Sequence, residues 1–178
     1  MRTNASFAYY DLTRKNVADS DPINTGFQIQ IGEERSKGYE AEIRTDLRNG
    51  WSLAAALSLI DAEIAEDTEA SNIGKRLQNV PRRSASIWAN YRFDGALRNW
   101  GAGLGVRHES SKTGPAVNFS VPGYTVADAG ISYQAAGYRL LLNVKNLFDK
   151  DYYAGTLNQF VVPLGDPRNV MLKAVFDF

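Results

Sequence analysis

Apolar and polar side chains alternate along most of the chain, and this period of two is typical of β-strands with two unlike faces. In residues 51–59 the odd positions carry Trp, Leu and Ala, whereas the even positions carry only Ser and Ala. Trp88 is an exception, because its large ring falls on the polar side of its segment. The alternation predicts eight strands, over residues 3–13, 27–47, 51–64, 82–93, 100–109, 124–134, 138–148 and 169–178.

The connections between these strands are of two kinds. Three are short turns, and four are long, polar and rich in Gly, Pro, Asn and Asp. Bacterial outer-membrane barrels have short turns at one end and long loops at the other, and their strands cross the bilayer in about 9–11 residues. The pattern predicts an all-β fold in one domain, an antiparallel up-and-down meander of about eight strands within a transmembrane β-barrel. The short turns are residues 48–50, 94–99 and 135–137, and the long loops are residues 14–26, 65–81, 109–122 and 149–167.

Aromatic residues gather at the ends of the predicted strands. A soluble β-sandwich also alternates polar and apolar faces, so alternation alone leaves that fold open. Aromatic girdles at the two membrane interfaces are a feature of membrane barrels, and we expect such a girdle beside the short turns. Its predicted members are Trp51, Tyr91, Phe93, Trp100, Tyr124, Tyr133, Tyr138, Phe176 and Phe178.

Composition narrows the classes of function. Twenty basic residues balance twenty acidic ones, so no net field points to nucleic acid as a partner. The chain has no cysteine and a single histidine, His108, which excludes a thiolate site and a multi-histidine metal site. We find no nucleophile paired with a base and no phosphate-binding glycine loop, and we predict that the chain is not an enzyme.

Several ordered motifs resemble TonB-dependent ferric-siderophore receptors of the bacterial outer membrane. "NLFDKDYY" at residues 146–153, followed by "GDPRNVMLKAVFDF" at residues 165–178, is similar to the C-terminal end of these receptors. "RSKGYEAEI" at residues 35–43, "GKRLQNVPRRSASIWANYRF" at residues 74–93 and "VPGYTVADAGISY" at residues 121–133 agree with the same family. The resemblance spans residues 1–178.

The resemblance implies that residues 1–178 form the C-terminal part of the receptor's β-barrel domain. It implies outer-membrane localisation, a ferric siderophore as the transported ligand, and no covalently bound cofactor. Family members also have a signal peptide, a TonB box and a plug domain, none of which is recognisable here. The chain is therefore expected to be a fragment that is not competent alone, with TonB acting only through the missing N-terminal part.

The last strand resembles the signal that the barrel-assembly machinery reads, a final aromatic preceded by apolar residues at every second position. The matching residues are Phe178, Phe176, Leu172 and Val170, with Ala174 between them. In the "NLFD" stretch we expect Leu147 and Phe148 to pack, and Asn146 and Asp149 to bond the backbone.

Candidate ligand-binding residues lie in the predicted long loops. Tyr152, Tyr153, Phe160 and Phe119 are aromatic residues that could stack on a siderophore, since aromatic rings supply contact area with little loss of entropy. Arg82, with Lys75, Arg76 and Arg83, concentrates positive charge that could contact lipopolysaccharide or attract an anionic chelate.

Two alternatives remain open from sequence. A small eight-stranded barrel could close on itself in the membrane, because barrels of that size fold with a side-chain-filled interior. A soluble β-sandwich that acts as a binding module is the other. Outer-membrane lipid is a partner only in the membrane interpretations.

Overall fold

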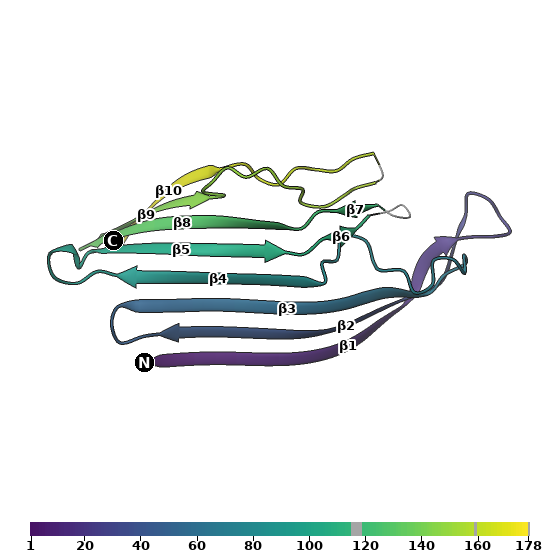
Figure 1. The fold of residues 1–178 in the computed structure, drawn as a ribbon, viewed down its shortest axis with the longest axis horizontal. Coiled ribbons are helices and arrows are strands. Elements are labelled where there is room, and N and C mark those ends of the chain that lie inside the picture. The colour runs from purple at the N-terminus through teal and green to yellow at the C-terminus, as the bar shows by residue number, and fades with distance from the viewer. Residues whose placement is uncertain (115–118, 159, 178) are drawn as a thin grey trace.

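The computed structural model describes residues 1–114, 119–158 and 160–177, and these form a single-layered antiparallel sheet (Figure 1). Neighbouring strands are joined in the order β1-β2-β3-β4-β5-β8-β9-β10, as an up-and-down meander requires. The strands are β1 (Arg2–Ser20), β2 (Gln28–Asp46), β3 (Trp51–Glu66), β4 (Arg83–Arg92), β5 (Trp100–Glu109), β8 (Tyr124–Ala135), β9 (Tyr138–Lys145) and β10 (Asn169–Phe176). The predicted fold of eight meandering strands is confirmed.

Connections differ between the two ends of the sheet. At the turn end, residues 47–50, 93–99 and 136–137 join β2 to β3, β4 to β5 and β8 to β9. At the loop end, residues 21–27, 67–82, 110–123 and 146–168 make the long connections. The third of these loops contains a two-residue pair, β6 (Lys112–Thr113) with β7 (Ser120–Val121). Among the described residues, no helix is long and apolar enough to cross a membrane.

The first strand is longer than the sequence predicts. Residues 14–20 were expected to lie in a loop, but β1 continues through them to Ser20 and pairs with β2 along most of its 19 residues. A register shift occurs where Val17 lies opposite Gly32. A Cβ on Gly32 would stand 3.2 Å from the Val17 carbonyl oxygen, so glycine permits this close approach. In Figure 1 the far ends of β1–β3 extend beyond the rest of the sheet.

The sheet is open, with β1 at one edge and β10 at the other. Neither alternative from the sequence is therefore realised in this structure, because a self-closing barrel would pair the edges and a sandwich would add a second layer. The described residues also lack the apolar core that a sandwich needs. Within the described part of the chain, the buried apolar residues are Ala62, Val121 and Val126.

The two faces of the sheet differ as the alternation predicts. The outer face carries the apolar parity, including Leu57, Leu104 and Leu172, whose exposed fractions are 45%, 55% and 68%. In water such exposure over a whole sheet face is unfavourable, whereas in a bilayer these side chains contact lipid. The inner face carries the opposite parity, with Ser58, Trp88 and charged residues.

Aromatic rings line the outer face at the turn end, as predicted. Trp51 lies 4.9 Å from Tyr91 between ring centroids, and Trp100 lies 4.9 Å from Tyr133. Further contacts bring in Phe93, Tyr138 and Phe176. The prediction was wrong for Tyr124, which begins β8 at the loop end. Phe178 lies outside the described residues.

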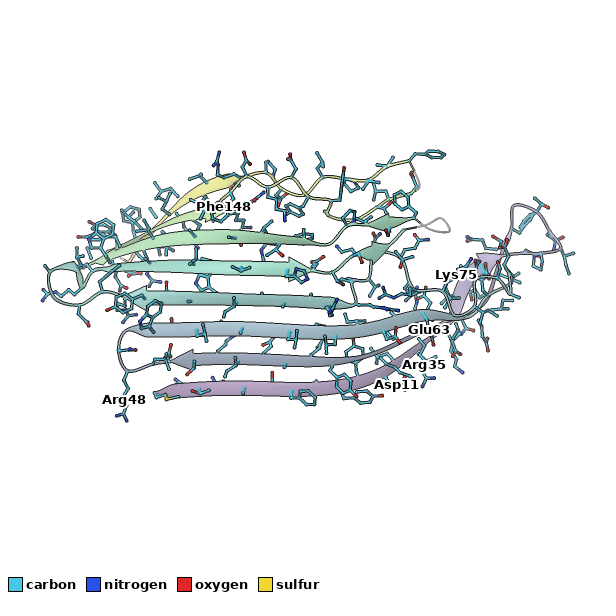
Figure 2. The ribbon with its side chains drawn as sticks, in the orientation of Figure 1. Asp11, Arg35, Arg48, Glu63, Lys75 and Phe148 are labelled. Atoms are coloured by element: carbon cyan, nitrogen blue, oxygen red, sulfur yellow. The ribbon has the colours of Figure 1, made fainter. Side chains whose placement is uncertain are left out.

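A second group of aromatic rings marks the opposite border of the apolar band. Tyr39 stacks with Phe7 at 6.1 Å and approaches Tyr9 at 5.1 Å. Directly beyond them on the same parity, the Arg35 guanidinium donates two hydrogen bonds to the Asp11 carboxylate, of 2.9 and 2.7 Å. Figure 2 shows this pair where β1 and β2 leave the main body of the sheet. The outer face thus passes from apolar to aromatic to charged, as expected across an interface.

Trp88 lies on the inner face because three glycines there leave room for its ring. Cβ atoms built on Gly103 and Gly105 would lie 2.6 and 2.2 Å from indole carbons of Trp88. A Cβ on Gly130, one strand further, would lie 3.7 Å from the same indole. The exception to the sequence pattern is therefore a large ring spread over a glycine stripe on β5 and β8.

Candidate functional site

Three long loops meet at the loop end through Asn79. Its side-chain Nδ2 donates to the Thr156 carbonyl at 2.7 Å, and its Oδ1 accepts from the Thr156 N–H at 2.9 Å. Its backbone N–H donates to the Thr113 carbonyl at 3.1 Å. One residue of loop 67–82 therefore holds both loop 110–123 and loop 146–168. Thr156 is 5% exposed, so the Asn79–Thr156 bonds are partly shielded from competing water.

Lys112 makes a second connection between two of these loops. Its Nζ donates to the Ala154 carbonyl at 2.7 Å and lies 5.8 Å from the centroid of the Tyr124 ring. The Glu109 Oε2 lies 2.6 Å from the Lys112 Nζ and forms an ion pair with it. Only 8% of Lys112 is exposed. A buried ammonium with such partners fixes the loops in one arrangement, because a charge left unpaired there would be costly.

Asn146 anchors the last long loop to the sheet. It is 2% exposed and has φ 49°, a left-handed conformation that asparagine tolerates better than most residues. Its Nδ2 donates to the carbonyls of Lys150 and Asp166, at 2.9 and 3.1 Å, and its Oδ1 accepts from the Lys150 N–H at 2.9 Å. Its own N–H donates to Asp128 Oδ1 at 2.8 Å. The loop therefore begins and returns at a single buried side chain.

The expected roles within the "NLFD" stretch hold for three residues of four. Asp149 Oδ1 accepts from the Arg168 N–H at 2.8 Å, so Asp149 and Asn146 both bond the backbone as expected. Leu147 is half-buried. Phe148, which was expected to pack, is 77% exposed. Phe148 lies beyond the end of β9, and its ring is exposed at the loop end of the sheet.

The five predicted ligand-binding residues all lie at the loop end, but in different settings. Tyr152 stacks on Tyr124 at 4.3 Å and lies against Gly165, and Phe119 lies against Gly114. Tyr153 and Phe160 are 42% and 84% exposed, and Arg82 is exposed as well. Among the described residues, no aromatic or cation–π pair joins two of these five. Tyr152 and Phe119 therefore pack within the loops, while Tyr153, Phe160 and Arg82 present exposed side chains.

Polar contacts of Asp19 and Arg76 also position the loops. The Asp19 carboxylate accepts a 2.6 Å hydrogen bond from the Thr68 N–H, and this bond lowers the pKa of Asp19 below its ordinary value. Burial lowers the pKa of Arg76, with a smaller effect from the nearby Arg82 cation. Arg76 Nη2 donates to the Val80 carbonyl at 3.5 Å, so this arginine is held within its own loop.

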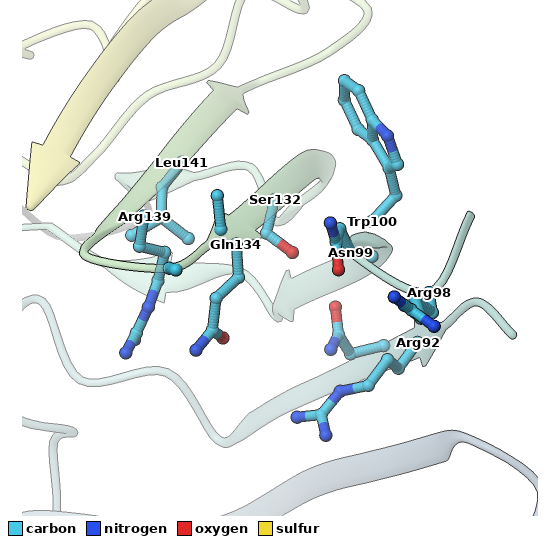
Figure 3. A pocket seen from close by; sticks show the side chains of 12 residues that line it. Arg92, Arg98, Asn99, Trp100, Ser132, Gln134, Arg139 and Leu141 are labelled. Carbon is cyan, nitrogen blue, oxygen red and sulfur yellow. The ribbon is translucent and has the colours of Figure 1, made fainter. Parts of the chain in front are cut away.

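A hollow of the inner face lies at the turn end and was not foreseen from the sequence. It has a volume of about 570 Å³, and Arg92, Arg98 and Arg139 stand around it (Figure 3). The available signal was the position of these arginines, each beside the short turn 94–99 or 135–137. Within residues 1–114, 119–158 and 160–177, no group of three His, Asp or Glu side chains is placed to hold a metal ion.

Comparison with known sequences covers nearly the whole chain. The family described as "TonB dependent receptor-like, beta-barrel" matches residues 1–147. The ferrichrome outer-membrane transporter/phage receptor of Escherichia coli is 36% identical over 178 residues, 96% of this chain and 24% of that protein. The metal-pseudopaline receptor of Pseudomonas aeruginosa is 34% identical over 181 residues, 99% of this chain and 25% of that protein. The chain spans about a quarter of the length of these curated relatives.

Comparison with solved structures agrees. The ferripyoverdine receptor of P. aeruginosa bound to ferripyoverdine superposes with a TM-score of 0.79 at 29% identity, over 99% of this chain and 25% of that one. The siderophore receptor PiuA of Acinetobacter baumannii has a TM-score of 0.80 at 23% identity, over 97% of this chain and 25% of that one, which supports the fold alone. The sheet is open and its outer face is apolar, as in the wall of a membrane barrel. Because the family model matches residues 1–147, the chain belongs to the β-barrel family of TonB-dependent receptors, proteins of the bacterial outer membrane.

Proposed function

We propose that this chain forms part of the barrel wall of an outer-membrane receptor that takes up ferric siderophores with energy from TonB. The observation that carries the proposal is the open eight-stranded sheet, whose whole length is similar to receptors named for ferrichrome and ferripyoverdine. Another relative is named as a receptor for metal-pseudopaline, so the proposed ligand class includes other metal chelates.

The free edges of β1 and β10 support the role of a wall segment. Lipid offers no hydrogen-bonding partner to a strand edge, so every spanning sheet must close. We infer that both edges pair with further strands of the same barrel, and that TonB acts on a region of the receptor outside residues 1–178. The outer face then contacts lipid, and the inner face lines the lumen.

The loop end is the proposed ligand-facing region. Asn79, Lys112 and Asn146 fix the loops. The exposed rings of Tyr153 and Phe160 offer aromatic surface to a chelate. Tyr152 and Phe119, which pack within the loops, complete the proposed aromatic set. Arg82 adds positive charge there and, with Lys75, a contact for lipopolysaccharide phosphates. Along β10, Val170, Leu172, Phe176 and the terminal Phe178 are the proposed recognition residues for the barrel-assembly machinery.

A chimera tests the proposal. Residues 1–178 replace the matching quarter of the E. coli ferrichrome transporter, and outer-membrane yield and heat-modifiable migration report whether the barrel closes. Uptake of radioactive iron is then measured with a panel of siderophores, with and without functional TonB. We expect a folded barrel and TonB-dependent uptake of at least one chelate. A chimera that fails to assemble would contradict the wall role, and an assembled barrel that imports no chelate would contradict the transport role.

A further inference from the structure

The hollow at the turn end is built from three separate segments of chain. Arg92 ends β4, Arg98 lies in the turn before β5, and Arg139 is the second residue of β9. Figure 3 shows their side chains around the hollow, while the Trp100 ring points away from it. The turns 94–99 and 135–137 therefore bring Arg139 beside Arg92 and Arg98, which precede it by more than 40 residues.

These arginines have no counter-charge in the described part of the chain. No ion pair or hydrogen bond there involves the side chain of Arg92, Arg98 or Arg139. Other arginines do have carboxylate partners: Arg35 pairs with Asp11 at 2.7 Å and Arg107 with Asp128 at 3.0 Å. Three guanidinium groups thus border one hollow of about 570 Å³ and form no hydrogen bond with other described residues.

Neutral polar groups line the same space. The side-chain amides of Asn90, Asn99 and Gln134 face it and, within the described residues, form no hydrogen bond with other protein groups. Gly101 also lines the space, and a Cβ there would lie 2.7 Å from Ser132 Oγ, so the missing side chain lets Ser132 approach. The hollow is therefore rich in hydrogen-bond donors that have no partner among the described residues.

We propose that this hollow binds a ligand that carries two or more carboxylates. Guanidinium groups pair with carboxylates through two parallel hydrogen bonds, and three of them on separate segments need more than one carboxylate for neutralisation. This proposal rests on the charges and polar groups that line the hollow, and it does not depend on the transport of an iron chelate. Carboxylates of this kind come from a free polycarboxylate in the lumen or from Asp and Glu side chains of a polypeptide segment lying there.

Binding is measured on the chimera described above, purified in detergent micelles at low salt, with heat-modifiable migration as the check that the barrel has closed. The probes are citrate, by calorimetry, and a fluorescent peptide with four glutamates, by anisotropy, with its glutamine counterpart as the neutral control. The variants are Arg92→Gln, Arg98→Gln, Arg139→Gln and the triple substitution. Arg48→Gln is the matched control, because Arg48 is exposed, lies in the turn at the same end and points away from the sheet (Figure 2).

We expect each single substitution to weaken binding about 3- to 5-fold, the upper range for an exposed ion pair, and the triple substitution to abolish it. The chimera with Arg48→Gln should bind as the unchanged chimera does. Arg139→Lys, which keeps the charge but loses the guanidinium fork, should fall between wild type and Arg139→Gln. This conservative variant also keeps the test valid if a glutamine variant folds poorly.

The two probes distinguish the source of the carboxylates. Tighter binding of the glutamate peptide than of citrate identifies a polypeptide segment, and the reverse identifies a small anion. The proposal is overturned if neither probe binds, if the glutamine peptide binds as well as the glutamate peptide, or if Arg48→Gln weakens binding as much as the three pocket substitutions do.

Discussion

The connections at the two ends of the sheet are stabilised by different groups. At the turn end the backbone stabilises them: the Leu47 N–H donates to the Trp51 carbonyl at 2.7 Å, and Gly50 and Gly137 take φ values of 83° and 81°. At the loop end buried polar side chains stabilise the connections, above all those of Asn79 and Asn146. A short turn has few conformations and needs only a residue that permits one of them, whereas a long loop needs specific bonds to offset its larger conformational entropy.

The largest effect is expected at the loop end, from Asn146→Ala in the chimera described above. The substitution leaves the Lys150 N–H and two carbonyls without their partner and places alanine in a left-handed conformation. We expect a loss of about 3 kcal/mol, because buried polar groups would lose their hydrogen bonds. Urea unfolding of the chimera in lipid vesicles measures it.

Asn146→Gly separates the two causes. Glycine accepts the left-handed backbone but makes none of the side-chain bonds, so it should recover only the smaller, conformational part of the loss. If Asn146→Gly unfolds at the wild-type urea concentration, the hydrogen bonds contribute nothing and the contrast between the two ends is wrong.

Between the ends, the wall itself is tested by a pair of adjacent residues on β10. Leu172→Arg places a charge on the outer face near mid-bilayer and should cost about 2 to 4 kcal/mol. Lys173→Arg, on the inner face, should cost almost nothing because that side chain is already hydrated. Heat-modifiable migration and outer-membrane yield of the chimera compare them. Equal tolerance at the two positions would mean that the faces do not separate lipid from lumen.

At the turn end, two glycines with positive φ differ in their surroundings. A Cβ on Gly50 would lie 2.5 Å from the Arg92 carbonyl oxygen, whereas one on Gly95 would meet nothing within 4 Å. Gly95→Ala should cost only the left-handed conformation, about 1 kcal/mol. Gly50→Ala should cost about 2 kcal/mol, because the backbone of β4 must also shift. Urea midpoints of the two variants give the difference, and identical midpoints would show that the turn adapts freely.

The smallest effect is a pH dependence at the loop end. The Thr68 N–H lowers the pKa of Asp19 in the folded chain, so the contact is present above the unfolded pKa and is lost as pH falls through the folded value. We expect the protection of the Thr68 amide against hydrogen exchange to decrease below about pH 4. Asp19→Asn should show weak protection at every pH. Protection that stays constant down to pH 2 would contradict the role of the carboxylate.

The strands were predictable where one face meets lipid. Period-two alternation located β3, β4, β5 and β8 to within two residues at each end. It missed residues 14–20 of β1, because beyond the membrane both faces of a strand meet water and the alternation disappears. Tyr124 was assigned to the wrong end and the wrong face, since its ring lies on the inner parity and packs against Tyr152 of the last long loop.

The loop contacts were harder to foresee. The tendency of asparagine to bond the backbone predicted the local part of the Asn146 contacts. Nothing local marked the bond from Asn79 to Thr156, which lies 77 positions away, because such a contact depends on how the strands between them order the loops. In the turn-end hollow, Arg139 is likewise distant in sequence from Arg92 and Arg98 and meets them only when the strands pair.

The placement of Trp88 over the glycine stripe makes the chain its own optical probe. The chain has three tryptophans, of which Trp51 and Trp100 belong to the outer aromatic girdle and Trp88 alone lies on the inner face. Lipids carrying bromine or a spin label quench indole emission at the bilayer border, while iodide and acrylamide quench it from water. The two kinds of quencher therefore report separately on the two sides of one sheet, without any label attached to the protein.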